Sequence, residues 1–278
     1  MYRLLAVCLV LIALSANAQG QDQTIPTATQ WTLDAAGPTQ RTAIRSVVLL
    51  RCQDSKGTGF VLKNGIVVTN WHVVEGCNAE QVTGTDPNGT ELKFSKMVTD
   101  SRVDLTLLRP ARPVSSGGLE LGPDQSPAIG TPVSAWGYPF RYNGPSPLLT
   151  VGYVAGYSAD EIDGRKVKHI IINGAINPGN SGGPLFRAAD DKVIGVVVAK
   201  YHLYPPFVRK AIDAMSRNKS GVVYTGTDAE GRPVEWVEGQ IVAMVLDQFY
   251  RTTQVMIGQA IALPELKQFI KIKEAELH

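Results

Sequence analysis

The chain has 278 residues, of which 44% are hydrophobic and 19% charged, and its formal net charge is only +2 at pH 7. This length suits one large domain or two fused small ones. The near-neutral charge argues against nucleic acid as a main partner. The sequence contains no His, Cys, Asp or Glu cluster with metal-ligand spacing, so we expect neither a metal nor another cofactor.

Residues 1–18 have the pattern of a cleaved signal peptide. Arg3 precedes an apolar run over residues 4–14, and Ala16-Asn17-Ala18 supplies the small residues expected before a cleavage site. The run is shorter than the about 20 residues that cross a bilayer, which argues against the alternative of an uncleaved membrane anchor. We therefore predict export to the periplasm or the extracellular space, without a stable membrane anchor.

Cleavage after residue 18 would leave two cysteines, Cys52 and Cys77. An even number of cysteines in an oxidising compartment favours a disulfide between them, with two free thiols as the alternative. Closing a loop of about 25 residues would stabilise the fold by roughly 3 kcal/mol in the chain-entropy model.

Residues 19–40 are polar and rich in Thr, Gln and Pro, which predicts a flexible leader. From residue 41, short β-branched runs separated by Gly, Asn and Pro are typical of an all-β sandwich or barrel. In the first half, strands are predicted at 47–50, 60–62, 66–68 and 104–108. Asn64-Gly65 can form a tight turn between two of them.

The second half continues this pattern after a Pro- and Gly-rich junction at 110–130. Strands are predicted at 133–136, 150–155, 166–172, 193–199 and 255–262, and a closing helix begins at Pro264. The two strand-rich halves, 41–113 and 127–278, suggest two packed barrels. Residues 201–253 form an insertion, for which we predict a helix opened by Pro205-Pro206, a hairpin around 228–232 and a helix over 241–250.

The candidate nucleophile is Ser181, in Gly179-Asn180-Ser181-Gly182-Gly183-Pro184. A serine hydroxyl needs a neighbouring base, and the oxyanion formed by its attack needs preorganised N–H donors. The flanking glycines allow a sharp turn that directs the N–H groups of Gly179 and Ser181 at one point, as an oxyanion hole. A glycine-rich turn with an incidental serine is the alternative.

The candidate base is His72, which follows an apolar strand and can project between the two barrels. The other histidines are His169, in a strand where a surface or barrel-facing role is expected, His202, in the insertion, and the terminal His278.

Asp104, at the mouth of the apolar strand 104–108, is the carboxylate expected to hold the imidazole tautomer. A turn or N-cap role is the alternative, and nearby Asp100 is a candidate for that role.

Four motifs occur in order: Gly57-Thr58-Gly59-Phe60, then Thr-Asn-Trp-His-Val-Val at 69–74, Asp-Leu-Thr-Leu-Leu at 104–108, and Ala-Ile-Asn-Pro-Gly-Asn-Ser-Gly-Gly-Pro at 175–184. Together they resemble the HtrA (Do-like) branch of the trypsin-fold serine proteases, over roughly residues 46–269. The resemblance implies two packed six-stranded antiparallel β-barrels, with His72, Asp104 and Ser181 as a catalytic triad in the cleft between them.

Asn180 precedes the candidate nucleophile, where digestive trypsin-like enzymes have an Asp that pairs with a newly released N-terminus. A neutral amide cannot form this ion pair, and no Ile-Val-Gly-Gly activation sequence precedes the first barrel. We therefore expect no activation of the zymogen type.

The resemblance also implies a specificity pocket. It places the floor at Ala175, with Ile176, Val197 and Val198 nearby. Since these residues provide no carboxylate to receive Lys or Arg, we predict cleavage after small or medium apolar residues.

The chain departs from the HtrA pattern in two places. Only a short helix is expected after residue 263, so we expect no PDZ domain. The insertion lies between two strands that should be near neighbours, where it could cap or gate the specificity pocket or mediate self-association. A passive surface role is the alternative.

The sequence thus predicts a serine endopeptidase that acts on exported polypeptides through an acyl-enzyme. One alternative is a catalytically silent member of the fold that binds peptides or acts like a chaperone. A non-proteolytic esterase is another, although an extended cleft suits peptide strands.

Overall fold

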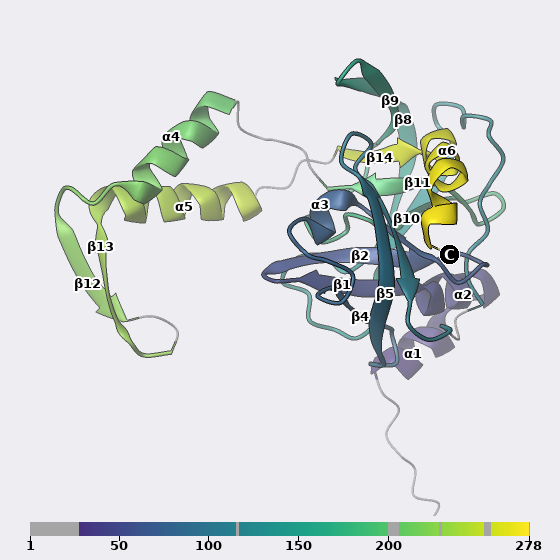
Figure 1. Cartoon of the computed structure of the whole chain (residues 1–278), viewed down its shortest axis with the longest axis horizontal. Coiled ribbons are helices and arrows are strands. Elements are labelled where there is room, and N and C mark those ends of the chain that lie inside the picture. Colours follow the sequence, from purple (N-terminus) through teal and green to yellow (C-terminus); the bar gives the residue numbers. More distant parts are fainter. Residues whose placement is uncertain (1–27, 115–116, 200–205, 228–229, 253–256, 278) are drawn as a thin grey trace, which may run out of the picture.

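The computed structural model describes residues 28–114, 117–199, 206–227, 230–252 and 257–277 (Figure 1). Its strands form two closed six-stranded barrels, in the orders β1-β2-β3-β6-β5-β4 and β10-β11-β14-β9-β8-β7. Neighbouring strands of both barrels pair antiparallel. The predicted all-β, double-barrel fold is therefore confirmed.

The first barrel contains two strands that the sequence pattern did not indicate. Its strands are β1 Val47–Cys52, β2 Ser55–Val61, β3 Val67–Thr69, β4 Thr83–Thr85, β5 Glu91–Asp100 and β6 Leu105–Pro110. The two unpredicted strands are β4, which has only three residues, and β5, which alternates charged exposed positions with buried ones such as Leu92 and Phe94. Neither has the apolar run that identified the other strands.

The second barrel brings distant segments together. Its strands are β7 Pro132–Gly137, β8 Leu148–Ile162, β9 Arg165–Ile172, β10 Pro184–Arg187, β11 Lys192–Val198 and β14 Gly258–Ala262. The strands β8 and β9 are joined by Asp163-Gly164, whose φ angles of +51° and +75° suit a tight hairpin turn. Since β11 pairs directly with β14, the insertion does lie between neighbouring strands.

Helix α6, Leu263–Lys273, follows β14 and carries Pro264 in its first turn. Leu266 and Phe269 bury its apolar face in a core shared by both barrels. A short 3-10 helix, Glu274–Leu277, ends the described chain. The C-terminal helix predicted from the sequence is therefore present and helps to hold the barrels together.

Two helices precede the first barrel where the sequence predicted a flexible leader. They are α1, Ala28–Ala35, and α2, Pro38–Ser46. Leu33 and Ile44 are buried in the shared core, and Arg41 Nε donates to the Leu33 carbonyl at 2.8 Å. The expectation is therefore wrong for residues 28–40, because tertiary burial orders a segment without strong periodicity. Residues 1–27 lie outside the described residues.

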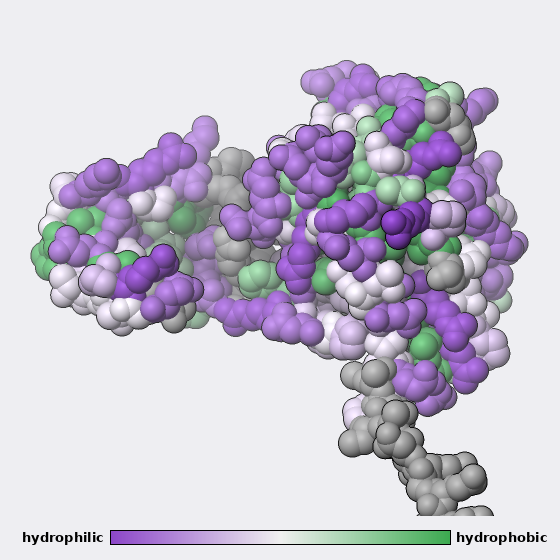
Figure 2. Space-filling model, turned by 60° about the horizontal axis from the view of Figure 1, so that its bottom comes forward, coloured by the Kyte–Doolittle hydropathy of each residue, from purple (hydrophilic) through white to green (hydrophobic). Residues whose placement is uncertain are grey.

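The insertion contains α4 Pro206–Arg217, β12 Val223–Thr227, β13 Pro233–Val237 and α5 Glu238–Thr252. This is the helix, hairpin and helix order that the sequence predicts; Pro205 and residues 228–229 lie outside the described residues. Figure 1 shows the insertion projecting beside the barrels, with α4 against α5. Hydrophobic residues appear on its surface between polar ones in Figure 2, and large apolar side chains are exposed, among them Phe207, Val223, Tyr224, Val245 and Phe249.

Among the described residues, the structure contains no helix with the length and apolar character needed to cross a membrane.

Candidate active site

The loop before Ser181 is built on a tight turn, Asn177-Pro178-Gly179-Asn180. The Asn180 N–H donates to the Asn177 carbonyl at 3.0 Å, and Gly179 has φ +94°. Proline at the second position and glycine with positive φ at the third are the features of a type II turn. A Cβ on Gly179 would also collide with the Tyr138 carbonyl oxygen. Backbone conformation and space therefore both require glycine here.

The orientation of one peptide in this turn sets the direction of the Gly179 N–H. The Phe140 N–H donates to the Pro178 carbonyl at 2.6 Å. Because a trans peptide is planar, the N–H of Gly179 points away from that carbonyl and from Phe140. Neither this N–H nor that of Ser181 donates to any residue that the structure describes. Two N–H groups on either side of Asn180 are thus left for an external acceptor.

Thr58, on β2 of the first barrel, forms hydrogen bonds with the Ser181 loop of the second barrel. Its N–H donates to the Ser181 carbonyl at 2.8 Å, and its hydroxyl donates to the Gly179 carbonyl at 2.6 Å. The same hydroxyl accepts from the Tyr138 N–H at 3.0 Å. Sequence reasoning found Thr58 in the Gly-Thr-Gly-Phe motif at 57–60 but assigned it no role. Its position between two glycines was the feature that could have identified it.

His72 and Asp104 are in direct contact. His72 lies in the short helix α3, Trp71–Val74, and its Nδ1 is 2.7 Å from Asp104 Oδ2 and 3.0 Å from Oδ1. The His72 backbone N–H also donates to Asp104 Oδ1 at 3.0 Å. The side chains are only 14% and 21% exposed. The carboxylate therefore binds both the ring and the backbone of one residue, which fixes the orientation of the imidazole.

The backbone of Asp104 has an unusual conformation, with φ +53°. Non-glycine residues in this left-handed region cost about 1–3 kcal/mol and persist where surrounding contacts hold them. Here Asn70, which is fully buried, donates its side-chain N–H to the Asp104 carbonyl at 2.9 Å. Asn70 is a second supporting residue to which the sequence gave no role.

The competing sequence candidates have other surroundings. Asp100 accepts two hydrogen bonds from the Arg102 guanidinium, at 3.0 and 2.9 Å, and a third from the Arg102 backbone N–H at 3.0 Å, and the guanidinium lowers the pKa of Asp100. His169 lies on β9 and is only 6% exposed. His202 and His278 lie outside the described residues.

The Ser181 hydroxyl is held by the main chain of the second barrel. Its Oγ accepts a hydrogen bond from the Ala199 N–H at 3.0 Å, and no hydrogen bond joins it to His72 in this structure. Rotation about χ1 moves a serine hydroxyl between three staggered positions. Hydrogen bonds at catalytic sites are also often long or poorly aligned before substrate binds.

The four residues expected to line the specificity pocket do not share one surface. Ile176 is partly buried and packs against Gly258 of β14. Val197 is buried inside the second barrel, whereas Val198 faces a pocket between the barrels. Consecutive strand residues point to opposite faces, so the side chains of Val197 and Val198 lie on opposite sides of β11, and the lining of the specificity pocket stays a prediction. The Val197 main chain holds the Ser181 loop, because its carbonyl accepts from the Gly182 N–H at 2.9 Å.

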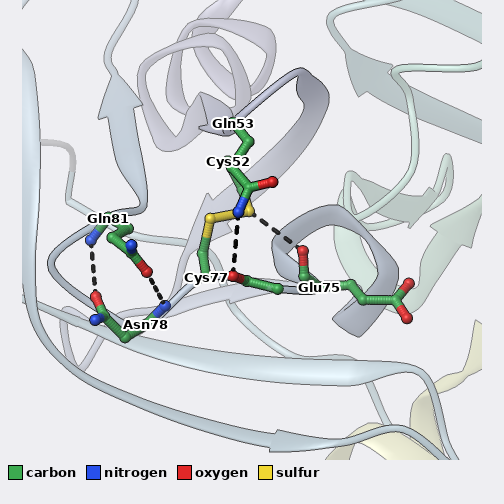
Figure 3. The surroundings of a disulfide bond; sticks show 7 residues. Cys52, Gln53, Glu75, Cys77, Asn78 and Gln81 are labelled. Carbon is green, nitrogen blue, oxygen red and sulfur yellow. Dashed lines mark hydrogen bonds between the residues drawn. A yellow bond between two sulfur atoms is a disulfide. The ribbon is translucent and has the colours of Figure 1, made fainter.

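A disulfide joins Cys52 and Cys77 beside the helix that carries His72 (Figure 3). It connects the end of β1 to the segment that follows α3. Gln53 Nε2 donates to the Gly76 carbonyl at 3.3 Å across the same junction. The position of α3 is therefore tied covalently to the first barrel.

Reduction of this disulfide is expected to lower the free energy of unfolding by about 3 kcal/mol, because the loop it closes spans 25 residues. Urea denaturation of the oxidised and reduced protein measures the difference. Gln53→Ala removes the hydrogen bond across the junction and keeps the disulfide, so it should cost about 1 kcal/mol or less. Identical urea midpoints with and without reductant would contradict a stabilising role for the bond.

Comparison with known proteins agrees with this geometry. Residues 57–196 match the family model of the trypsin-like peptidase domain. A probable periplasmic serine endoprotease DegP-like from Rickettsia conorii is 35% identical over 147 residues, which are 51% of this chain and 28% of that protein. The magnetosome formation protease MamE from Magnetospirillum gryphiswaldense is 34% identical over 156 residues, 54% of this chain and 20% of that protein. The chain thus spans less than a third of the length of these relatives.

Solved structures show the same fold. The Rv3671c protease of M. tuberculosis, in an inactive form, superposes with a TM-score of 0.56 at 20% identity, over 89% of this chain and 98% of that one. The HtrA-type protease AlgWS227A with a tripeptide gives a TM-score of 0.54 at 22% identity, over 84% of this chain and 62% of that one.

Proposed function

Because the chain belongs to the trypsin-like peptidase family, in its HtrA branch, we propose that it is a serine endopeptidase that hydrolyses exported polypeptides through an acyl-enzyme. The observation that carries the proposal is the pair of unbonded N–H groups, of Gly179 and Ser181, beside a serine hydroxyl. The contact between His72 and Asp104 supports it.

In the proposed reaction, the Ser181 hydroxyl first rotates from the Ala199 N–H towards His72. His72 takes the hydroxyl proton as Ser181 Oγ attacks the substrate carbonyl, and Asp104 stabilises the resulting imidazolium. The N–H groups of Gly179 and Ser181 donate to the oxyanion. His72 then protonates the leaving amine, and water, deprotonated by the same imidazole, releases the acyl group. The proposal includes no metal or organic cofactor.

The proposed specificity pocket has its floor at Ala175, with Ile176 and Val197 nearby, and all three offer only apolar side chains. A cationic side chain would lose its hydration there without gaining a charged partner. The protein is therefore expected to cut casein after small or medium apolar residues, as mapped by mass spectrometry of the products. Casein incubated with the Ser181→Ala variant gives the background. Efficient and selective cleavage after Lys or Arg would contradict this specificity.

A catalytically silent peptide-binding or chaperone-like protein is a second candidate function. The hydrogen bond from the Ala199 N–H to Ser181 Oγ favours it, because the hydroxyl is not bonded to its base in this structure. Labelling with a fluorophosphonate separates the candidates, since only an activated serine reacts. A protein that is labelled but does not digest casein would instead be an esterase.

The periplasmic relatives and the signal pattern of residues 1–18 support export as part of this proposal. Self-association through residues 201–253 and the domain limits at 41–113 and 127–278 stay predictions. The exposed apolar side chains of α4, β12 and α5 support a role for the insertion in contacts with other polypeptides.

A further inference from the structure

A pocket of about 270 Å³ lies between the two barrels, beside the candidate catalytic aspartate. Trp71 and Asp104 line it from the first barrel. The second barrel contributes Asp160 on β8, His169 on β9 and Val198 on β11, among others. Since the same β11 strand leads to Ala199, which bonds the Ser181 hydroxyl, the pocket adjoins the proposed reaction site.

His169 forms a buried polar wall of this pocket. It is 6% exposed and shares its face of β9 with Val167, which packs in the core between the barrels. Its Nδ1 is buried and has no hydrogen-bond partner. Burial lowers the pKa of His169, an effect that the carboxylate of Asp160 only partly offsets. The ring is therefore neutral at pH 7, and Nδ1 can accept a hydrogen bond when Nε2 carries the proton.

Asp160 supplies the charge at the open side of the pocket. Its Oδ2 lies 3.7 Å from His169 Nδ1, which is too long for a hydrogen bond, and its side chain is 57% exposed. Arg102 also lines the pocket, but its guanidinium is paired with Asp100 through Nε and Nη2. An incoming cation would therefore meet a carboxylate and an unoccupied ring nitrogen rather than an unpaired positive charge.

We propose that this pocket is a second recognition site for the substrate, which takes a Lys or Arg side chain at one fixed position other than directly before the cut. The apolar stem would pack against Val198 and Trp71, whose ring also attracts cations. The charged head would donate to His169 Nδ1 and pair with Asp160. The identification of the ligand as substrate rests on the proposed function, whereas the binding of a cationic side chain does not.

Fluorescence anisotropy of labelled octapeptides with the full-length Ser181→Ala chain tests the proposal without turnover. Each position of an alanine-rich peptide carries in turn Lys or norleucine, which has a similar stem without the charge. At one position Lys is expected to bind about tenfold more tightly than norleucine. Adding Asp160→Asn should reduce this ratio to about threefold or less.

Glu161→Gln is the matched control, because it removes the same charge from the next residue of β8, which faces the opposite side of the strand. It should leave the ratio unchanged. His169→Phe removes the acceptor at similar volume and should act like Asp160→Asn; if it does not fold, the exposed Asp160 still provides the test. Equal binding of Lys and norleucine at every position, or equal effects of Asp160→Asn and Glu161→Gln, would overturn the proposal.

The two proposals fail in different ways. Selective binding of Lys peptides by a protein whose parent chain is not labelled by a fluorophosphonate would refute the endopeptidase and keep the recognition site. Labelling and casein digestion, without any preference for Lys in the binding scan, would refute the recognition site and keep the endopeptidase.

Discussion

Ser181→Ala is expected to lower kcat for peptide hydrolysis by about 10⁶-fold, the size of effect seen when a serine nucleophile is removed from a triad. The variant keeps both N–H groups of the proposed oxyanion hole but has no atom to form the acyl-enzyme. Fluorophosphonate labelling should disappear together with the cleavage of a fluorogenic peptide.

The fold of this variant should be little affected. Ser181 is 5% exposed, and its hydroxyl accepts one hydrogen bond, from the Ala199 N–H. Leaving this N–H unpaired costs about 1–3 kcal/mol. Ser146→Ala is the matched control, because Ser146 is also buried and its hydroxyl bonds Thr29 Oγ1 at 3.2 Å, within a different part of the chain. If Ser181→Ala retained a thousandth of the activity, another group would have to be the nucleophile.

Asp104→Asn is expected to lower kcat by about 10⁴-fold, because an amide holds the wrong imidazole tautomer. Asp104 accepts from both the ring nitrogen and the backbone N–H of His72. An asparagine can satisfy only one of these with its oxygen, and its NH₂ group turns Nδ1 into an acceptor. The proton then lies on Nε2, which can no longer take the proton of Ser181. Peptide hydrolysis and the rate of fluorophosphonate labelling both measure the loss.

Asp100→Asn separates this role from a general effect of negative charge. It makes the same change in a nearby carboxylate that binds Arg102 instead of His72. Activity within about threefold of the parent protein is expected, since Asp100 bonds Arg102 and none of the three proposed catalytic residues. Similar losses in the two variants would show that Asp104 has no special part in the reaction.

The local sequence carries the information that identifies the elements of the fold. Apolar β-branched runs mark the central strands, and Asp163-Gly164 marks the β8–β9 turn. Pro178-Gly179 favours a type II turn on backbone grounds alone. Short or charged strands such as β4 and β5 are not predicted from apolar runs. Pairing with neighbouring strands of the barrel, rather than local apolar character, stabilises them.

The sequence by itself determined which residue types are available for the chemistry and their order along the chain: His72, then Asp104, then the glycine-flanked Ser181. Only the tertiary structure decided which of them touch, because the contacts join residues far apart in the chain, 32 residues for His72 and Asp104 and more than 100 across the two barrels. It placed Thr58 against the loop of Ser181, buried His169 with an unpaired nitrogen, and turned Val197 away from Val198. It also directed the Ser181 hydroxyl to Ala199 instead of His72. Local patterns cannot specify such relations, since each depends on how separate elements pack and on which hydrogen bonds remain unfilled afterwards.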